Sequence, residues 1–547
     1  MKSGSEHVYD ALVDAGVELA VGIPGRHSLP LDTRIREDDE MRYVMARHET
    51  AIPYVAWGYY ETGGGPAATI TVPGPGDTNA SNGLRNATMD QVPMVHLSTD
   101  VPPEQRGKGA LHEVDPSTFD AVVKENVDVT NPNAVPSAVA GGIEAALTPP
   151  YGPVRIGMPY LGEAIETGAA EATPESVDHD NGDAYERVAE LLASAERPVV
   201  YAGVGARRSA DGPAALADLV ETLDAPVVGS YKGKGAFPET DPRWAGTTGA
   251  QLPAGAVEML DRADVVLALG TLFDVPTTRD ASVPMGEHLV HVTVDPDQVD
   301  RVYEADAAIL DDVGTACREL TARLEGADAG GWDGAAVGRR VREEYLAFVE
   351  SEGMFRQDAP AATPAVLRAL REALPEEAIA VADIAEFRTW ALQLFEAPRH
   401  DSFILTGAWT SMGVGLPGAL GAKLANPDRP VVCLTGDGGL MQCVEELHTA
   451  AEEGLDVTTV VFNNAAYGMI NTTPGLTDRF GWESPDLPAI AEGFGCGATT
   501  VETPPEAAAA VEDALDTDRP ELVNVLVDPD EPSSMDAWRY ESEIEFP

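Results

Sequence analysis

An acidic residue and an amide residue follow two apolar runs near the end of the chain. Asp437 lies in the sequence GDGG at 436–439, after the run Val431–Thr435, and Asn464 closely follows the run Thr458–Phe462. The residues between the runs are typical of a glycine turn and a helix. A right-handed crossover would make the runs parallel, and as neighbouring strands their carboxyl ends would meet at one sheet edge. Open α/β sheets bind ligands at that edge.

The residue types at this edge fit a metal ion and a diphosphate. A carboxylate with amide and backbone oxygens suits a hard cation such as Mg²⁺, whose shell water and phosphate oxygens complete. Gly438 and Gly439 would let the backbone approach a diphosphate closely, and the following helix would point its positive N-terminus at it. We therefore expect a metal and diphosphate site at Asp437 and Asn464.

The spacing of these residues also resembles a known motif. The tripeptide Gly436–Gly438 and the pair Asn463–Asn464, with Asp437 and Asn464 27 residues apart, resemble the thiamine-diphosphate motif of the acetolactate synthase and pyruvate decarboxylase superfamily. The resemblance implies that Asp437 and the Asn464 side chain bind Mg²⁺. It also implies the Ala466 carbonyl as a further metal ligand.

A second stretch resembles the segment that folds thiamine into its bent shape in this superfamily. It reads LTGAWTSMGVGLPGALGAK and covers residues 405–423. By this resemblance Met412, an unbranched and polarizable side chain, lies beneath the thiazolium ring. The carbonyl of Thr410 would accept a hydrogen bond from the aminopyrimidine.

The first part of the chain supplies two candidate catalytic residues. Glu49, in MARHETAIPYVAWGYYETGG at 45–64, occupies the position of the family's catalytic glutamate, which faces the pyrimidine ring and activates thiamine. Its apolar neighbours predict a buried carboxylate with an altered pKa. His112 stands where the synthases carry glutamine, and an imidazole there could pass protons to a carbanion. A surface or core histidine is the alternative for His112.

Other positions depart from the acetolactate synthase pattern. Glu386 replaces a glutamine near the diphosphate, which is unfavourable unless Arg388 or the metal compensates. Thr473 stands in place of a tryptophan that shapes the acceptor pocket, which predicts a larger or more polar pocket. The family's central domain holds FAD, but Val275 and Pro276 follow Asp274 where an arginine is usual. FAD therefore stays open as a third cofactor beside thiamine diphosphate and Mg²⁺.

The elements that must position these residues form three similar blocks. Each block alternates short β-branched runs with longer amphipathic or Ala-rich stretches, as strands and crossover helices do in a parallel sheet. The predicted strands are Leu19–Ile23, Ala68–Val72, Met94–Ser98, Pro198–Ala202, Val265–Leu269, Leu289–Val294, Ala378–Ala382, Val431–Thr435 and Thr458–Phe462. We predict three consecutive open parallel α/β domains: a pyrimidine-binding domain at 1–165, a central domain at 185–325 and a diphosphate-binding domain at 360–530.

The composition excludes some partners. With 36 basic and 91 acidic residues, the net charge of −55 would repel nucleic acid and anionic membranes. The acidic residues are spread along the whole chain, which indicates adaptation to high salt and predicts instability in dilute buffer. No segment has the length of an apolar membrane span, and the four cysteines are too few for a disulfide framework. We expect a cytoplasmic protein.

These observations lead to one main hypothesis and two others. The resemblance implies an acetolactate-synthase-like carboligase, a transferase or lyase that decarboxylates pyruvate and condenses the product with a second 2-oxo acid, as in branched-chain amino acid biosynthesis. The alternative is a 2-oxo acid decarboxylase or lyase that does not carboligate. A non-catalytic paralogue that binds the cofactor is less favoured because Glu49 is retained. The family arrangement also implies a homodimer or homotetramer with active sites at the subunit interface.

Overall fold

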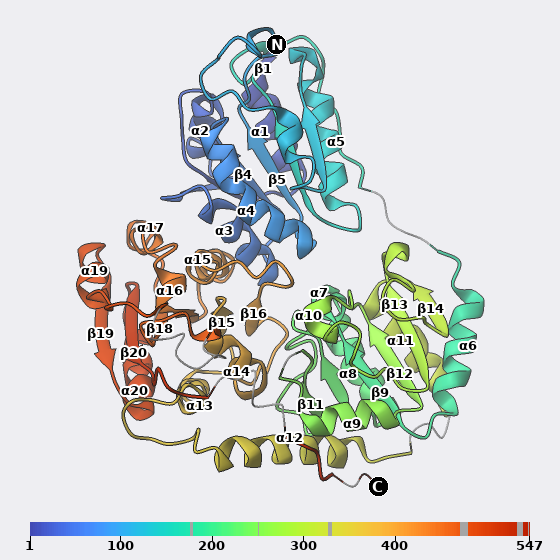
Figure 1. The fold of residues 1–547 in the computed structure, drawn as a ribbon. Coiled ribbons are helices and arrows are strands. Elements are labelled where there is room, and N and C mark those ends of the chain that lie inside the picture. Colours follow the sequence, from blue (N-terminus) through green and yellow to red (C-terminus); the bar gives the residue numbers. More distant parts are fainter. Residues whose placement is uncertain are drawn as a thin grey trace.

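Three six-stranded sheets follow one another along the chain (Figure 1). The computed structural model describes residues 1–174, 179–249, 251–326, 331–470, 480–532, 540–544 and 546. Within these residues, every strand pair of the three large sheets is parallel. The predicted fold class, three open parallel α/β domains in series, is confirmed.

The N-terminal sheet lies at the top of Figure 1. Its strands, in order across the sheet, are β3 (Arg42–Met45), β2 (Leu19–Gly22), β4 (Ala67–Thr71), β5 (Met94–Ser98), β7 (Pro153–Gly157) and β6 (Glu125–Asp128). Its helices are α1 (Gly4–Asp14), α2 (Leu29–Arg36), α3 (Ala51–Glu61), α4 (Pro75–Met89) and α5 (Val135–Leu147). A small antiparallel pair, β1 (Lys2–Ser3) with β8 (Ala164–Ile165), joins the two ends of this part.

The central sheet repeats this plan. Its strands are β11 (Trp244–Thr247), β10 (Val227–Gly229), β9 (Pro198–Ala202), β12 (Val265–Leu269), β13 (His288–Thr293) and β14 (Ala307–Leu310). Its helices are α6 (Gly182–Ala193), α7 (Val204–Arg208), α8 (Gly212–Leu223), α9 (Ala254–Arg262), α10 (Val275–Thr278) and α11 (Val313–Leu324). The chain order reverses between β9 and β12, which is the switch point where such sheets bind ligands.

The C-terminal sheet carries the predicted metal site. Its strands are β16 (Phe403–Leu405), β15 (Ile379–Ala382), β17 (Val431–Gly436), β18 (Val457–Asn463), β20 (Glu521–Leu526) and β19 (Gly497–Val501). Its helices are α13 (Thr363–Ala373), α14 (Glu386–Leu394), α15 (Gly415–Ala425), α16 (Asp437–Leu440), α17 (Glu446–Glu453), α19 (Leu487–Gly493) and α20 (Pro504–Leu515). All nine strands predicted from the sequence are present, three with the predicted ends and six with ends that differ by one residue.

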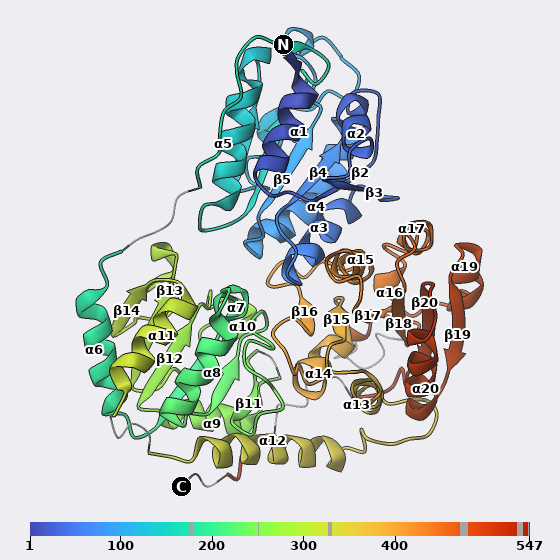
Figure 2. The same ribbon diagram turned by 180° about the vertical axis from the view of Figure 1, so that it is seen from behind.

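A long helix, α12 (Gly334–Ser351), crosses beneath the central and C-terminal sheets (Figures 1 and 2). Asp333 caps it by accepting a hydrogen bond from the Ala336 amide at 2.8 Å. Val337, Val341, Tyr345 and Val349 are buried at the four-residue spacing of one helix face. The helix therefore presents one apolar face to the sheets that it crosses.

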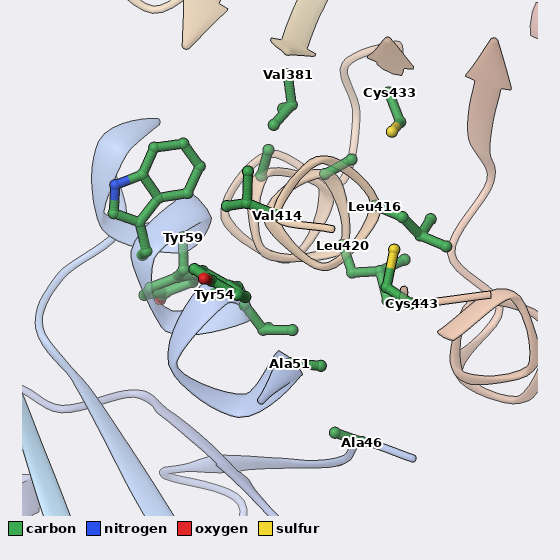
Figure 3. Close-up of a cluster of buried hydrophobic side chains, with 14 of the residues drawn as sticks. Ala46, Ala51, Tyr54, Tyr59, Val381, Val414, Leu416, Leu420, Cys433 and Cys443 are labelled. Carbon is green, nitrogen blue, oxygen red and sulfur yellow. The ribbon is translucent and has the colours of Figure 1, made fainter. Parts of the chain in front are cut away.

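Helix α3 of the N-terminal part packs against α15 of the C-terminal part (Figure 3). Tyr54 and Tyr59 on α3 and Leu416 and Leu420 on α15 belong to one buried apolar cluster that both parts share. A Cβ atom at Gly421 would lie 2.0 Å from the carbonyl oxygen of Val55, and one at Gly58 would lie equally close to Gly418. The helices approach this closely because glycine faces backbone on both sides.

All four cysteines are free and buried. Cys317 lies in the core of the central part, whereas Cys433, Cys443 and Cys496 lie in the cluster shared by the N- and C-terminal parts. Among the described residues, no helix has the length and apolar character needed to cross a membrane.

Candidate active site

Asp437 and Asn464 lie at the ends of two neighbouring strands. Strands β17 and β18 pair in parallel, with Gly436 opposite Phe462. Asp437 comes directly after β17 and Asn464 directly after β18, so both residues leave the sheet at the same edge. The arrangement predicted from the two apolar runs is therefore present in the structure.

The carboxylate of Asp437 is 3% exposed, and its Oδ2 atom is buried without a hydrogen-bond partner among the described residues. Burial raises the pKa of this carboxyl to about 6, although backbone amides of Gly438 and Ala465 favour its charged form. An unpaired buried carboxylate oxygen is unfavourable unless a cation meets it. The residue thus fits a metal ligand.

The turn after β18 shapes the second half of this edge. The Asn464 side-chain oxygen accepts a hydrogen bond from the Ala466 amide at 3.1 Å, and Ala465 has a φ of 54°. Ala466 is buried and pairs with Gly481 in an isolated antiparallel bridge. Asn464 and Ala466 are therefore held in one turn, as a shared metal site would require.

Gly438 lies where a side chain would not fit, so its backbone stays uncovered by a side chain of its own. A Cβ atom there would lie 2.9 Å from the ring of Tyr467 and 3.4 Å from the terminal methyl of Met412. Gly439 is tighter, since a Cβ atom would lie 2.7 Å from Asp383 Oδ2. The backbone of the GDGG turn and the Met412 side chain are therefore close together, and a diphosphate with its metal fits the residues present.

The loop that carries Thr410 and Met412 is strained and fixed at several points. Thr410 has a φ of 49°, a left-handed conformation that costs a β-branched residue about 1–3 kcal/mol. Asp383, fully buried at the end of β15, accepts hydrogen bonds from the Gly413 amide at 3.0 Å and from the Thr435 hydroxyl at 2.8 Å. Sequence reasoning missed Asp383, although a lone acid after a predicted strand is a detectable signal.

Glu49 and His112 both lie beside the turn at the start of α4. A Cβ atom at Gly76 would lie 3.6 Å from Glu49 Oε1, and one at Gly74 would lie 2.5 Å from the His112 carbonyl oxygen. Glu49 Oε2 accepts a hydrogen bond from Asn79 at 3.0 Å. The expected deep burial of Glu49 is not found in the single chain, where its side chain is only half-buried.

A buried ion network that the sequence reasoning missed anchors the start of α4. Asp77, in its first turn, accepts hydrogen bonds from His96 at 3.0 Å and from Arg155 at 2.7 Å, and Arg155 also pairs with Asp100. Although burial opposes it, these partners lower the pKa of Asp77. The signal that could have revealed this network is a polar residue inside an apolar run, such as His96 in the predicted strand Met94–Ser98 and Arg155 in β7.

Glu49 and His112 are not joined directly to the predicted metal ligands within one chain. Among the described residues, no hydrogen bond or ion pair links Glu49 or His112 to Asp437 or Asn464. A cavity of about 420 Å³ does lie between the two parts. Its lining includes Met412, Gly413, Met441 and Gln442 on one side and His48, Thr50, Tyr54 and Asn82 on the other.

The side chains of Glu386 and Arg388 lie in different surroundings. A Cβ atom at Gly468 would lie 2.5 Å from Glu386 Oε2 and 2.9 Å from the Asn464 side-chain nitrogen, so Glu386 reaches the predicted metal site. Arg388 is buried, donates to the Thr406 carbonyl at 3.2 Å and lies over the Tyr231 ring. These contacts do not support the idea that Arg388 compensates Glu386. The acceptor-pocket position Thr473 lies outside the described residues.

Family models match all three parts of the chain in order. They are the N-terminal TPP binding domain of thiamine pyrophosphate enzymes at residues 2–119, the central domain at 185–320 and the C-terminal TPP binding domain at 383–525. Together these matches cover well over half of the chain. The chain belongs to the thiamine pyrophosphate enzymes.

This thiamine pyrophosphate enzyme is similar along nearly its whole length to acetolactate synthases. A probable acetolactate synthase large subunit of Methanococcus aeolicus is 28% identical, over 97% of this chain and 93% of its own. The acetolactate synthase isozyme 1 large subunit of Escherichia coli (strain K12) is 26% identical over 97% and 94%. The acetolactate synthase large subunit of Corynebacterium glutamicum is 29% identical over 96% and 87%. The enzyme therefore stands close to acetolactate synthase large subunits.

The central part of this thiamine pyrophosphate enzyme is where the resemblance left FAD open. Arg207, Arg208 and Lys232 follow β9 and β10 at the ligand-binding edge, but each pairs with a carboxylate of the N-terminal part. The Tyr231 ring fills the space beside Gly249, where a Cβ atom would lie 2.1 Å from it. These ion pairs leave none of the three cations free for the diphosphate of a flavin.

Proposed function

We propose that the protein is a Mg²⁺-dependent 2-oxo acid carboligase that resembles acetolactate synthase, decarboxylating pyruvate and condensing the product with a second 2-oxo acid. The observation that carries this proposal is the shared sheet edge of Asp437 and Asn464, where a buried carboxylate oxygen lacks a partner. The extent of similarity to acetolactate synthase large subunits supports the reaction class.

The residues at this edge would bind and orient the cofactor. Asp437, the Asn464 side chain and the Ala466 carbonyl would hold Mg²⁺, and Gly436, Gly438 and Gly439 would face the diphosphate. When bound, thiamine diphosphate supplies a carbon nucleophile that adds to a 2-oxo acid and stabilises the negative charge left by loss of CO₂. Met412 would support the thiazolium ring, and the Thr410 carbonyl would accept from the aminopyrimidine.

The N-terminal part would supply the proton-handling groups. Glu49 would hold a proton at the pyrimidine ring, and His112 would exchange protons near the reacting carbon. Because no hydrogen bond or ion pair among the described residues joins them to Asp437 within one chain, we propose that Glu49 of one subunit faces the C-terminal part of another. At least two subunits would then form each site, as in the homodimer or homotetramer that the resemblance implies.

A second candidate function is decarboxylation without carboligation. It is favoured by His112, whose backbone lies at the same turn as Glu49 and whose imidazole could protonate the decarboxylated product. A non-catalytic protein that only binds the cofactor is the third reading. It leaves Glu49 without a role, because that residue does not anchor the diphosphate.

A product assay separates these functions. Full-length protein in concentrated KCl is given pyruvate, thiamine diphosphate and Mg²⁺, and acetolactate and acetaldehyde are quantified. Acetolactate as the main product supports the carboligase, and acetaldehyde alone supports the decarboxylase. If pyruvate and a panel of other 2-oxo acids give no product while the cofactor binds, the enzymatic proposal is wrong. Omission of Mg²⁺ with a chelator should abolish turnover.

We also propose that the central part works without flavin, since Arg207, Arg208 and Lys232 are engaged by carboxylates. The purified protein should then lack flavin absorbance near 450 nm, and added FAD should change neither rate nor thermal stability. A stoichiometric flavin in the purified protein would contradict this.

We propose that the three domains span residues 1–165, 185–325 and 360–530.

A further inference from the structure

A buried carboxylate of the N-terminal part holds the base of the loop that carries Thr410 and Met412. Asp90 is 3% exposed, and its Oδ1 accepts a hydrogen bond from the Gly407 amide at 2.9 Å. Its Oδ2 accepts from Trp57 Nε1 at 2.8 Å and from Lys232 at 3.0 Å. Asp90 thereby joins one backbone amide of the C-terminal part to side chains of the other two parts.

A carboxylate of the C-terminal part makes the corresponding contact in the opposite direction, with the segment that precedes Glu49. Glu446, at the start of α17, is fully buried. Its Oε1 accepts hydrogen bonds from the backbone amides of Arg47 at 2.9 Å and His48 at 3.0 Å, and its Oε2 accepts from the Thr449 hydroxyl at 2.6 Å. A carboxylate of the C-terminal part therefore fixes the two residues that precede Glu49.

We propose that Asp90 and Glu446 are reciprocal positioning residues, each fixing in the other domain the loop that carries cofactor-contacting groups. Asp90 sets the Thr410 and Met412 loop, and Glu446 sets the approach to Glu49. The inference rests on the proposed function, because it assigns these loops to thiamine diphosphate. Buried carboxylates suit this task because charge-assisted hydrogen bonds to backbone amides are strong and directional.

The two carboxylates predict different kinetic signatures. If the Met412 loop is loosened, Met412 and Thr410 no longer hold the bound cofactor firmly. Cofactor binding should therefore weaken. Loosening the segment before Glu49 leaves the metal and diphosphate contacts in place, so it should lower the rate of cofactor activation instead. A merely structural role for either residue would lower thermal stability without this separation of effects.

Asp90 is tested with Asp90→Asn. An asparagine cannot keep all the contacts, because its amide nitrogen would face either the Gly407 amide or the Trp57 and Lys232 donors. In concentrated KCl with Mg²⁺, we expect the dissociation constant for thiamine diphosphate to rise about tenfold, with kcat at saturating cofactor changed less than about threefold. Asp401→Asn, which removes another buried carboxylate paired with Arg429, should leave that constant unchanged.

Glu446 is tested with Glu446→Ala and Glu446→Gln. Alanine removes both acceptor oxygens, whereas glutamine keeps one oxygen for the Arg47 and His48 amides and can donate to the Thr449 hydroxyl. We expect Glu446→Ala to slow proton exchange at thiazolium C2 and kcat about tenfold or more, with cofactor affinity within about twofold of wild type. Glu446→Gln should recover most of the rate.

The wild-type protein separates failure of this inference from failure of the proposed function. If wild type does not bind thiamine diphosphate, the proposed site is wrong. If it binds, and both Asp90→Asn and Glu446→Ala change only melting temperature, as the control Glu239→Gln does, the positioning roles are wrong. Glu239 suits this control because it is buried and paired with Lys234. Loss of cofactor affinity in Glu446→Ala would also overturn its assigned role.

Discussion

At the scale of single residues, the candidate site depends on carboxylates in contrasting surroundings. Asp437 is buried with one unpartnered oxygen, Glu49 is half-buried beside a glycine turn, and Glu386 lies next to Asn464. The first suits a cation and the second a proton transfer. The third adds negative charge where a diphosphate is expected, and each residue predicts a separate experimental result.

Glu49→Gln should block cofactor activation while sparing cofactor binding. Glutamine retains the size and the oxygen acceptor for Asn79 but cannot stabilise a proton on the pyrimidine ring. We expect proton exchange at C2 to slow by about 10²–10⁴-fold, as measured by NMR in heavy water with bound cofactor. Glu37→Gln, an exposed change in the same part of the chain, should exchange like wild type. Wild-type exchange in Glu49→Gln would remove Glu49 from the mechanism.

Glu386→Gln should tighten cofactor binding. Removing a negative charge beside Asn464 relieves repulsion of the diphosphate, so at saturating Mg²⁺ the dissociation constant should fall about threefold to tenfold. Fluorescence titration or calorimetry measures this, with Glu512→Gln on the exposed side of α20 as the charge-matched control. Weaker binding would instead show that Glu386 helps to retain the metal.

Part of the site could be predicted from the sequence because its information is local. Asp437 and Asn464 follow apolar runs that fold into adjacent strands, so pairing alone brings them to one edge. Asp90 and Glu446 act across domains, and no pattern within their own segments indicates a backbone amide more than 300 residues away as partner. Such contacts become visible only after the domains have docked.

At the scale of elements, the contact of α3 with α15 determines how the two cofactor-binding parts meet. Gly58 and Gly421 permit backbone contact between the helices, and large side chains such as Tyr54 pack around them. The strands were predictable because runs of Val, Ile and Leu mark buried parallel strands. Strand β6 (Glu125–Asp128) was not predicted because it is a polar edge strand.

Gly421→Ala should destabilise the protein although alanine favours helices. The added methyl group would lie 2.0 Å from the Val55 carbonyl, and such overpacking costs about 1–3 kcal/mol. Gly141→Ala in α5 is the matched control, because nothing lies within 4 Å of its added Cβ, and alanine there should stabilise by about 0.5–1 kcal/mol. Chemical denaturation in concentrated KCl measures both, and equal effects would contradict the tight helix contact.

At the scale of the whole molecule, the net charge is expected to govern how stability depends on salt. A net charge of −55 acts against the compact state through self-repulsion, while the ion pairs of Glu61 with Arg207, Arg208 and Lys232 are buried. Salt screens exposed charges far more than buried ones. Added salt should therefore relieve the surface repulsion and leave the interdomain pairs largely intact.

The melting temperature should accordingly rise with KCl. The Debye length shortens from about 10 Å at 0.1 M to about 3 Å at 1 M, so most of the gain should appear across this range. Calorimetry at fixed pH and protein concentration, with KCl varied from about 0.1 to 3 M, checks the expectation. A melting temperature that stays flat or falls would contradict the adaptation to high salt inferred from composition.

The reactivity of the four buried cysteine thiols can report which part of the structure opens first during unfolding. Cys317 becomes reachable only when the central core opens, whereas Cys433, Cys443 and Cys496 become reachable when the cluster shared by the two cofactor-binding parts opens. Pulsed alkylation followed by peptide mass spectrometry would therefore time these two events separately. The wild-type sequence suffices, and no probe has to be introduced.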